Sequence, residues 1–156
     1  MRIRCVALLL AVAFGAAAQK YNGPFPAKPD LPYLKHADSL IATEATEAKE
    51  EKGKKDDITY VVAGAASSAR TPLASPIFLL QTEKLAAASL ALYRLESKNG
   101  HREITFAPKK APKAIRMEAT RISDKLFRLE VEESLEPGEY SISPEGSNKV
   151  FCFQVY

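Results

Sequence analysis

The alternation of apolar and polar residues near the end of the chain constrains the fold more than any other feature. Across residues 127–132, apolar side chains alternate with charged ones, which predicts a strand with one face in water. A turn at Pro137 and Gly138, in which we expect Gly138 to take positive φ, leads to a second strand around 140–142. Residues 150–156 carry apolar groups on both alternating faces, so we expect this closing strand to lie inside a sheet.

The rest of the chain repeats this short-strand pattern and shows no regular alternation of strands with helices. Eight to ten strands at short spacing predict an all-β fold, an antiparallel β-sandwich of two sheets, with an all-β barrel as the alternative. The other strands are expected near 33–34, 40–41, 58–63, 77–80, 90–96, 102–106 and 115–120.

Two segments have conflicting local signals. Alanines between Glu83 and Leu95 favour a helix, but Lys98-Asn99-Gly100 is typical of a hairpin turn, so we assign 90–96 to a strand that follows one helical turn. Residues 43–57 are almost entirely Glu, Lys, Ala and Thr. Their weak apolar face predicts an exposed, mobile connection with some helical tendency, and a docked helix is the alternative.

The beginning of the chain has the pattern of an export signal. Arg2 and Arg4 precede an apolar run that ends in three alanines at 16–18, which predicts a signal peptide over 1–18. A Pro-rich extended arm follows over 19–37, and a single domain over 38–156. We therefore expect a secreted or periplasmic protein with no integral membrane segment after signal removal.

The charge balance argues against a nucleic-acid partner. The whole chain has a formal net charge of +3, and removing Arg2 and Arg4 leaves 3 − 2 = +1. Binding of phosphates requires a concentrated basic face, which this nearly neutral chain does not predict.

Cysteine usage excludes an internal disulfide in the mature chain. Only Cys5 and Cys152 occur, and Cys5 lies within the predicted signal. Because Cys152 is flanked by Phe151 and Phe153, we interpret it as a small buried apolar residue, with an intermolecular bridge as the alternative.

The stretch Leu-Glu-Pro-Gly-Glu-Tyr, residues 135–140, resembles the turn that enters a late strand in immunoglobulin-like and fibronectin-type sandwiches. The resemblance implies that Tyr140 makes a hydrogen bond across a corner of the sandwich and that Leu135 fills the core beneath it. Leu135, Pro137, Gly138, Tyr140 and Cys152 are therefore expected to have structural roles.

A wider set of stretches is similar to small uncharacterised bacterial secreted proteins. These are D-L-P-Y-L at 30–34, L-A-L-Y-R-L at 90–95 and F-C-F-Q-V at 151–155. This resemblance implies an exported all-β protein and supplies no catalytic residues.

No residue constellation indicates catalysis, a metal or a cofactor. His36 and His101 lie far apart in the sequence, and we find no carboxylate at ligand spacing beside His101. Asp38 would share a strand face with His36, but two ligands do not make a site, so we predict no metal site. Ser67 and Ser68 follow a strand, but their context lacks the glycine-flanked elbow of a serine hydrolase. We expect no catalytic residues and no cofactor.

Binding is the use that the predicted fold favours. Tyr21, Phe25 and Tyr33 are the aromatic residues that we expect outside the core, and the basic loop 109–113 is interpreted as a solvated surface. We therefore expect a monomeric binding or structural module whose partner is an envelope or extracellular protein or a glycan. The alternative is a hydrolase or other envelope enzyme with a site assembled from dispersed polar residues.

Overall fold

The computed structural model describes residues 20–156, so the expected signal peptide at 1–18 lies outside the described residues. Within 20–156, the chain forms strands and two short 3-10 turns, η1 (Lys54–Asp56) and η2 (Ala87–Ser89), and no α-helix. The predicted all-β, antiparallel class is confirmed. This part of the chain contains no helix with the length and apolar character needed to span a membrane. The strands are β1 (Tyr33–His36), β2 (Ser39–Ala42), β3 (Glu44–Glu47), β4 (Lys49–Lys52), β5 (Ile58–Ala63), β6 (Arg70–Thr71), β7 (Ile77–Gln81), β8 (Leu90–Lys98), β9 (His101–Phe106), β10 (Met117–Ser123), β11 (Leu126–Val131), β12 (Gly138–Pro144) and β13 (Lys149–Val155).

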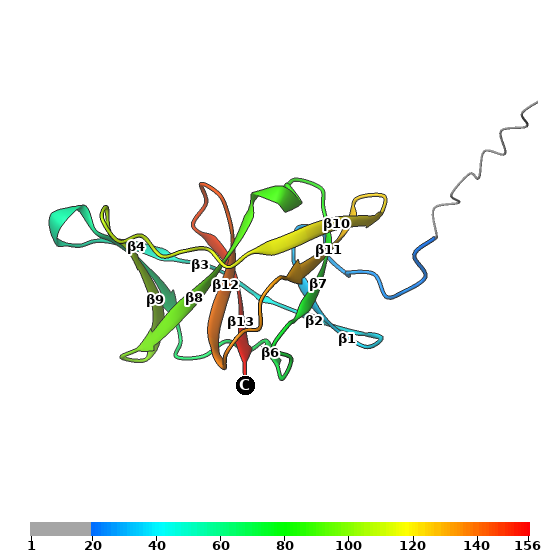
Figure 1. Cartoon of the computed structure of the whole chain (residues 1–156), viewed down its shortest axis with the longest axis horizontal. Coiled ribbons are helices and arrows are strands. Elements are labelled where there is room, and N and C mark those ends of the chain that lie inside the picture. The colour runs from blue at the N-terminus through cyan, green and yellow to red at the C-terminus, as the bar shows by residue number, and fades with distance from the viewer. Residues whose placement is uncertain (1–19) are drawn as a thin grey trace, which may run out of the picture.

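The strands form two sheets, which Figure 1 shows side by side. The first has the order β10-β11-β7-β1-β2, with every neighbouring pair antiparallel. The second has the order β3-β13-β12-β8-β9-β5-β4, and the short strand β6 pairs with β13 in parallel. Strands β12 and β8 lie at the centre of the second sheet, where β12 pairs with both β13 and β8.

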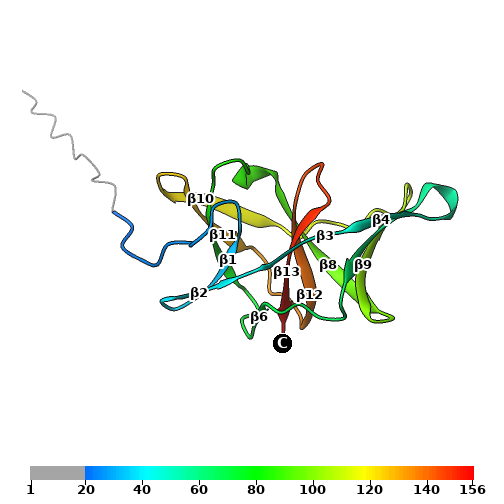
Figure 2. The same ribbon diagram turned by 180° about the vertical axis from the view of Figure 1, so that it is seen from behind.

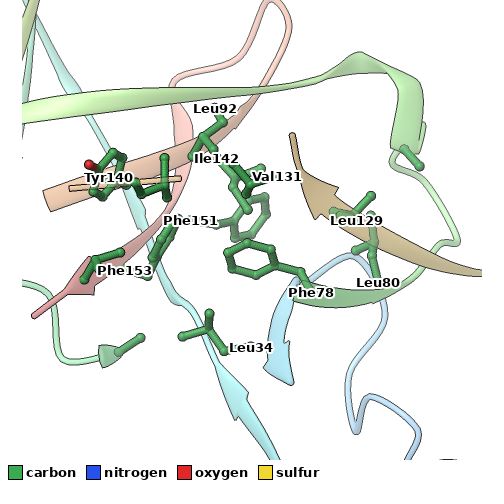
Figure 3. Close-up of a cluster of buried hydrophobic side chains, with 14 residues drawn as sticks. Leu34, Phe78, Leu80, Leu92, Leu129, Val131, Tyr140, Ile142, Phe151 and Phe153 are labelled. Carbon is green, nitrogen blue, oxygen red and sulfur yellow. The ribbon is translucent and has the colours of Figure 1, made fainter. Parts of the chain in front are cut away.

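The main core lies between the two sheets, which makes the architecture sandwich-like (Figure 3). Phe78 of the first sheet meets Phe153 of the second edge-on, with ring centroids 5.0 Å apart, and Tyr140 stacks on Phe153 at 5.5 Å. Such aromatic pairs add to the free energy gained from burial of their surface. The labelled residues of this core are Leu34, Phe78, Leu80, Leu92, Leu129, Val131, Tyr140, Ile142, Phe151 and Phe153.

The second sheet closes on itself. Its two end strands, β3 and β4, are consecutive in the chain and are separated only by the buried residue Ala48. β3 pairs with β13, and β4 pairs with β5. Figure 2 shows β2, β3 and β4 as one nearly continuous extended run that crosses the whole molecule. Because one part of this run pairs with β13 and the next part pairs with β5, the run closes the second sheet. That half of the protein therefore has the form of a small barrel.

The expectation for residues 43–57 is wrong, because this segment forms β3, β4 and the turn η1 instead of a mobile connection with helical tendency. Pairing with β13 and β5 supplies hydrogen bonds that an isolated helix with few apolar residues cannot match. The charged residues of β4 are all exposed. Long-range pairing has therefore overridden local helix propensity.

The prediction for the closing strand is confirmed. β13 lies between β12 and β3, inside the second sheet. Its residues Phe151, Phe153 and Val155 face the main core, while Val150 and Cys152 face a second apolar cluster inside the barrel. Apolar groups on both faces of a strand thus correspond to two cores.

The strand and hairpin assignments around Gly100 are also confirmed. β8 and β9 are antiparallel neighbours, with pairing that runs up to Lys98 and His101. Asn99 and Gly100 have φ values of 52° and 80°. Positive φ at both central residues is the geometry that favours Asn-Gly in two-residue hairpins.

The Pro-rich arm is anchored where it enters the first sheet. The carboxylate of Asp30 accepts hydrogen bonds from the backbone N–H groups of Glu83, Lys84 and Leu85, at 2.9 to 3.1 Å. Tyr33 was expected outside the core, but only 7% of it is exposed, because β1 pairs with β2 on one side and β7 on the other. The expectation that Tyr33 lies outside the core is therefore wrong. Phe25, for which the expectation was the same, is exposed.

Candidate functional site

The barrel half of the protein is a cup with one closed and one open end. Side chains at alternating positions of β5, β8, β9, β12 and β13 point inward, as the period of two along a strand requires. On β9 these positions run from Arg102 at the closed end through Ile104 to Phe106 at the open end. The two ends have opposite chemical character.

A buried ion cluster plugs the closed end. Arg102 of β9 is only 1% exposed, and its Nη2 and Nη1 donate to the two carboxylate oxygens of Glu44 at 2.7 and 3.1 Å. Arg102 also donates to the carbonyl oxygens of Ala63 and Gly64, at 2.6 and 2.9 Å. The paired hydrogen bonds between Arg102 and Glu44 join β9 to β3. The bonds to Ala63 and Gly64 join β9 to the end of β5 and the loop after it.

Glu139 of β12 is the second acid of the cluster. Its Oε2 accepts a hydrogen bond from the backbone N–H of Ser67 at 3.0 Å and lies 3.8 Å from Nη1 of Arg102. Its Oε1 is buried with no hydrogen-bond partner. Burial raises the pKa of Glu139 above its ordinary value, and the Ser67 N–H and Arg102 oppose this rise only in part.

The pKa of Glu44 is shifted in the opposite direction to that of Glu139. Burial alone would raise the pKa of Glu44, but the hydrogen bonds from Arg102 and Ser67 and the positive charge of Arg102 outweigh it, so the pKa is lowered. The backbone N–H of Ser68 also donates to Glu44, at 3.2 Å. The serines considered above as hydrolase candidates therefore belong to the loop that covers the ion cluster.

Cys152 of β13 lies beside this cluster and is fully buried as a free thiol. Burial raises its pKa to about 12, and the neighbouring Arg102 opposes this rise. A thiol that stays protonated and inaccessible is a poor nucleophile, which suits the expected structural role.

The open end is a cavity of about 440 Å³, within the range of small-molecule sites. Its floor is mainly aliphatic, with Val62, Leu95 and Val150 all buried, and the buried Ser141 of β12 adds one hydroxyl. One wall is aromatic: the ring of Phe106 lies edge-on to Tyr60 at 5.7 Å and to Tyr93 at 5.4 Å. The sequence expectation missed all three of these wall aromatics.

The rim of the cavity is polar. It is formed by the turn between β12 and β13 and by the end of η2, and it carries serine, asparagine and glutamate side chains. Glu145 is exposed and is the one Asp, Glu, Lys or Arg side chain that lines the cavity within the described residues. The remaining polar rim residues are Ser89, Ser143, Ser147 and Asn148.

The residues that the sequence singled out near Pro137 and Gly138 lie at the start of β12, at the opposite end of that strand from the rim of the cavity. Tyr140 is buried, and its hydroxyl donates to the carbonyl oxygen of Glu136 at 2.7 Å. Leu135 is buried in the same core cluster as Tyr140. Its backbone N–H donates to the carbonyl oxygen of Ala74 at 2.7 Å, which ties the turn to the loop before β7.

The expected conformation of Gly138 is corrected. Gly138 begins β12 and is absent from the glycines with positive φ in the described part of the chain. A Cβ at this position would lie 3.1 Å from Nη2 of Arg94, whose guanidinium donates to the carbonyl oxygen of Pro137. A larger residue here would therefore require the Arg94 guanidinium to shift by a few tenths of an ångström, whereas the backbone conformation does not require glycine.

The two histidines are placed apart. His36 shares a 2.8 Å hydrogen bond with the hydroxyl of Thr71, and His101 shares a 2.7 Å contact with the carboxylate of Glu103. Within residues 20–156 no three His, Cys, Asp or Glu side chains gather as possible metal ligands.

Sequence reasoning missed the ion cluster, although one signal was present. Arg102 alternates with Ile104 and Phe106, so the period of two places its charge on the same face as two large apolar residues. An inward charge predicts a buried partner, but the partners Glu44 and Glu139 come from strands that only the fold brings near.

Comparison of the chain with models of protein families, with curated proteins and with solved structures found no match.

Proposed function

We propose that the protein is an exported, non-catalytic β-sandwich module that binds a small, mainly apolar ligand in its cup. The observation that carries the proposal is the cavity of about 440 Å³ with its aliphatic floor, aromatic wall and polar rim. Ligand sites typically combine such apolar linings with a few polar groups that fix orientation. The ligand is either a free molecule or an apolar group carried by a larger envelope or extracellular molecule.

The buried ionisable groups favour binding over catalysis. Arg102, Glu44 and Glu139 pair with one another at the closed end, and Cys152 keeps its proton. An enzyme of the alternative kind needs titratable groups that converge on the substrate. The groups that line the cavity are instead aliphatic, aromatic and hydroxyl side chains, apart from the amide of Asn148 and the carboxylate of Glu145.

The proposal includes an immunoglobulin-like type for the sandwich, and the strand order supports it. That type places strands A, B, E and D in one sheet and C, F and G in the other, with C′ added beside C in some members. The order β1-β7-β11-β10 corresponds to A-B-E-D, and β13-β12-β8-β9 corresponds to G-F-C-C′. Strands β2 to β6 then form an insertion between A and B.

The corner around Tyr140 gives separate support for the same type. In immunoglobulin-like domains a tyrosine near the start of strand F donates a hydrogen bond to the backbone a few residues upstream. Tyr140 is near the start of β12, the strand that corresponds to F, and its acceptor Glu136 precedes it by four residues.

A fluorescent probe tests the proposed binding. N-phenyl-1-naphthylamine is neutral and gains fluorescence in apolar sites, so we expect saturable binding to residues 19–156. Ala91→Trp, at the half-buried cavity wall, should fill the cup and weaken binding about tenfold or more, equivalent to ~1.4 kcal/mol.

Ala42→Trp, at an exposed position on β2, is the matched control and should leave probe binding unchanged. Absence of saturable binding, or equal weakening by the two tryptophans, would show that the cup is not the site.

A further inference from the structure

The cup changes character along its depth. Val62, Leu95 and Val150 at the floor are buried, whereas Ser147 and Asn148 at the rim are exposed. From Phe106 at the open end to Arg102 at the closed end is four residues of one strand, or about 13 Å. A ligand that enters this space passes from a polar ring into a narrow aliphatic chamber.

The chamber has a dead end. Arg102 and Glu44 cross it with hydrogen bonds of 2.7 and 3.1 Å, and Cys152 and Leu95 lie above them, both buried. A bound group therefore cannot pass through the barrel. Its length inside the cup is limited by the ion cluster.

The lining selects against sugars and charged groups. A charge or a set of hydroxyls at the floor would lose most of its hydrogen bonds on burial, because among the buried lining residues Ser141 is the one that offers a side-chain hydroxyl. Tyr60 and Tyr93 both pack edge-on against Phe106, so the three rings form one side of a channel. An unbranched hydrocarbon chain needs no partners and fills such a channel from rim to floor.

We propose that the cup binds a single aliphatic chain, inserted end-first, with the polar head of the molecule left at the serine-rich rim. This rests on the proposed function and names its ligand class: the acyl or alkyl chain of a lipid. The hydroxyl and amide groups of Ser143, Ser147 and Asn148 suit hydrogen bonding to an ester, alcohol or carboxyl head.

Chain length provides the test. Primary alcohols from 1-hexanol to 1-dodecanol are titrated against the bound naphthylamine probe on the mature chain. Each added methylene buried in the cup should tighten binding about fourfold, until the chain reaches the floor and the affinity becomes constant. Acids and amines of matched chain length distinguish a free fatty acid from a neutral or cationic lipid, and all three series should share the same increment.

Two variants move the floor in opposite directions. Ala48→Leu adds bulk at a buried lining position and should make the affinity level off at a shorter chain, whereas Val62→Ala should move that point to a longer chain. Ala42→Leu, outside the cup, should leave unchanged the chain length at which the affinity becomes constant.

Affinity that is independent of chain length, or that keeps rising through 1-dodecanol in every variant, overturns the proposal. Either outcome leaves the proposed function standing if the probe still binds and Ala91→Trp still weakens that binding.

Discussion

Tyr140 illustrates how one side chain fixes a corner of the sandwich. Its ring is stacked on Phe153 in the main core, while its hydroxyl reaches the carbonyl oxygen of Glu136 at 2.7 Å. The guanidinium of Arg94 lies 5.8 Å from the ring centroid and also donates to the carbonyl oxygen of Pro137. The turn is therefore held by two neighbouring side chains that project from the same face of the sheet.

Removing the Tyr140 hydroxyl tests that contribution. We expect Tyr140→Phe to lower the free energy of unfolding by about 1 kcal/mol, because one hydrogen bond is lost while the ring stays in the core. Urea denaturation measures the change. Tyr33→Phe, at another buried tyrosine, is the control. Equal midpoints for Tyr140→Phe and the parent would remove the corner role.

Glu139 and Glu44 share one arginine but should respond to pH in opposite ways. The raised pKa of Glu139 means that its ionised form is disfavoured in the fold, so its cost appears as the pH rises through the folded pKa. The lowered pKa of Glu44 means that it stabilises the fold above its unfolded pKa, and this is lost as the pH falls through the folded value.

Two isosteric variants separate these effects. Glu139→Gln should raise the free energy of unfolding by about 1 kcal/mol at neutral pH, and this gain should shrink under acid conditions. Glu44→Gln should lower it by about 2 kcal/mol at neutral pH, because Arg102 loses its charged partner, and this deficit should also shrink in acid. Urea midpoints measured across the acidic range show both trends. A Glu139→Gln variant that is less stable than the parent at neutral pH contradicts the assignment.

At the scale of elements, β13 is the strand on which both cores depend. It pairs with β12, β3 and β6, and its alternating residues supply Phe151 and Phe153 to one core and Val150 and Cys152 to the other. Deleting residues 150–156 should therefore prevent folding, since the ladder and the buried aromatic surface are lost together.

Far-UV circular dichroism and urea denaturation of the truncated chain test this expectation. Deletion of Tyr156 alone is the control, because this residue lies beyond the strand and is 57% exposed. A cooperative unfolding transition in the chain that ends at Lys149 would show that β13 is dispensable.

β3 and β4 show the limit of local reasoning at the same scale. Residues 43–57 have the composition of an exposed helix or a solvated linker, and no alternation of apolar residues marks them as strands. They become strands because β13 and β5 offer unpaired edges, and because Arg102 gives Glu44 a buried partner. Neither partner is visible within a short window of sequence.

For the molecule as a whole, we predict that the chain is exported and that its signal peptide is removed. An arginine-flanked apolar run followed by three alanines motivates cleavage before Gln19. Mass spectrometry of the exported protein should find Gln19, or a direct neighbour, as the first residue. Soluble exported protein that retains Met1 would exclude the signal.

The sandwich and the cup share one sheet, which explains how the molecule combines two cores in a short chain. The central strands β12, β8 and β13 present one face to the first sheet and the other to the barrel interior. Strands β3, β4 and β5 enclose that second face, which would otherwise be an exposed apolar surface. Without these strands there would be no cup.

Local sequence patterns predicted the all-β class, the hairpin at Asn99 and Gly100, and the two-faced character of β13. These follow from period-two alternation and turn chemistry, which are local properties of the chain. Three features became apparent only in the tertiary structure: the closure of the second sheet through Ala48, the cavity, and the pairing of Arg102 with Glu44. Arg102 and Glu44 lie 58 residues apart. Those features depend on which strands become neighbours, and that is set by the burial of distant segments against one another.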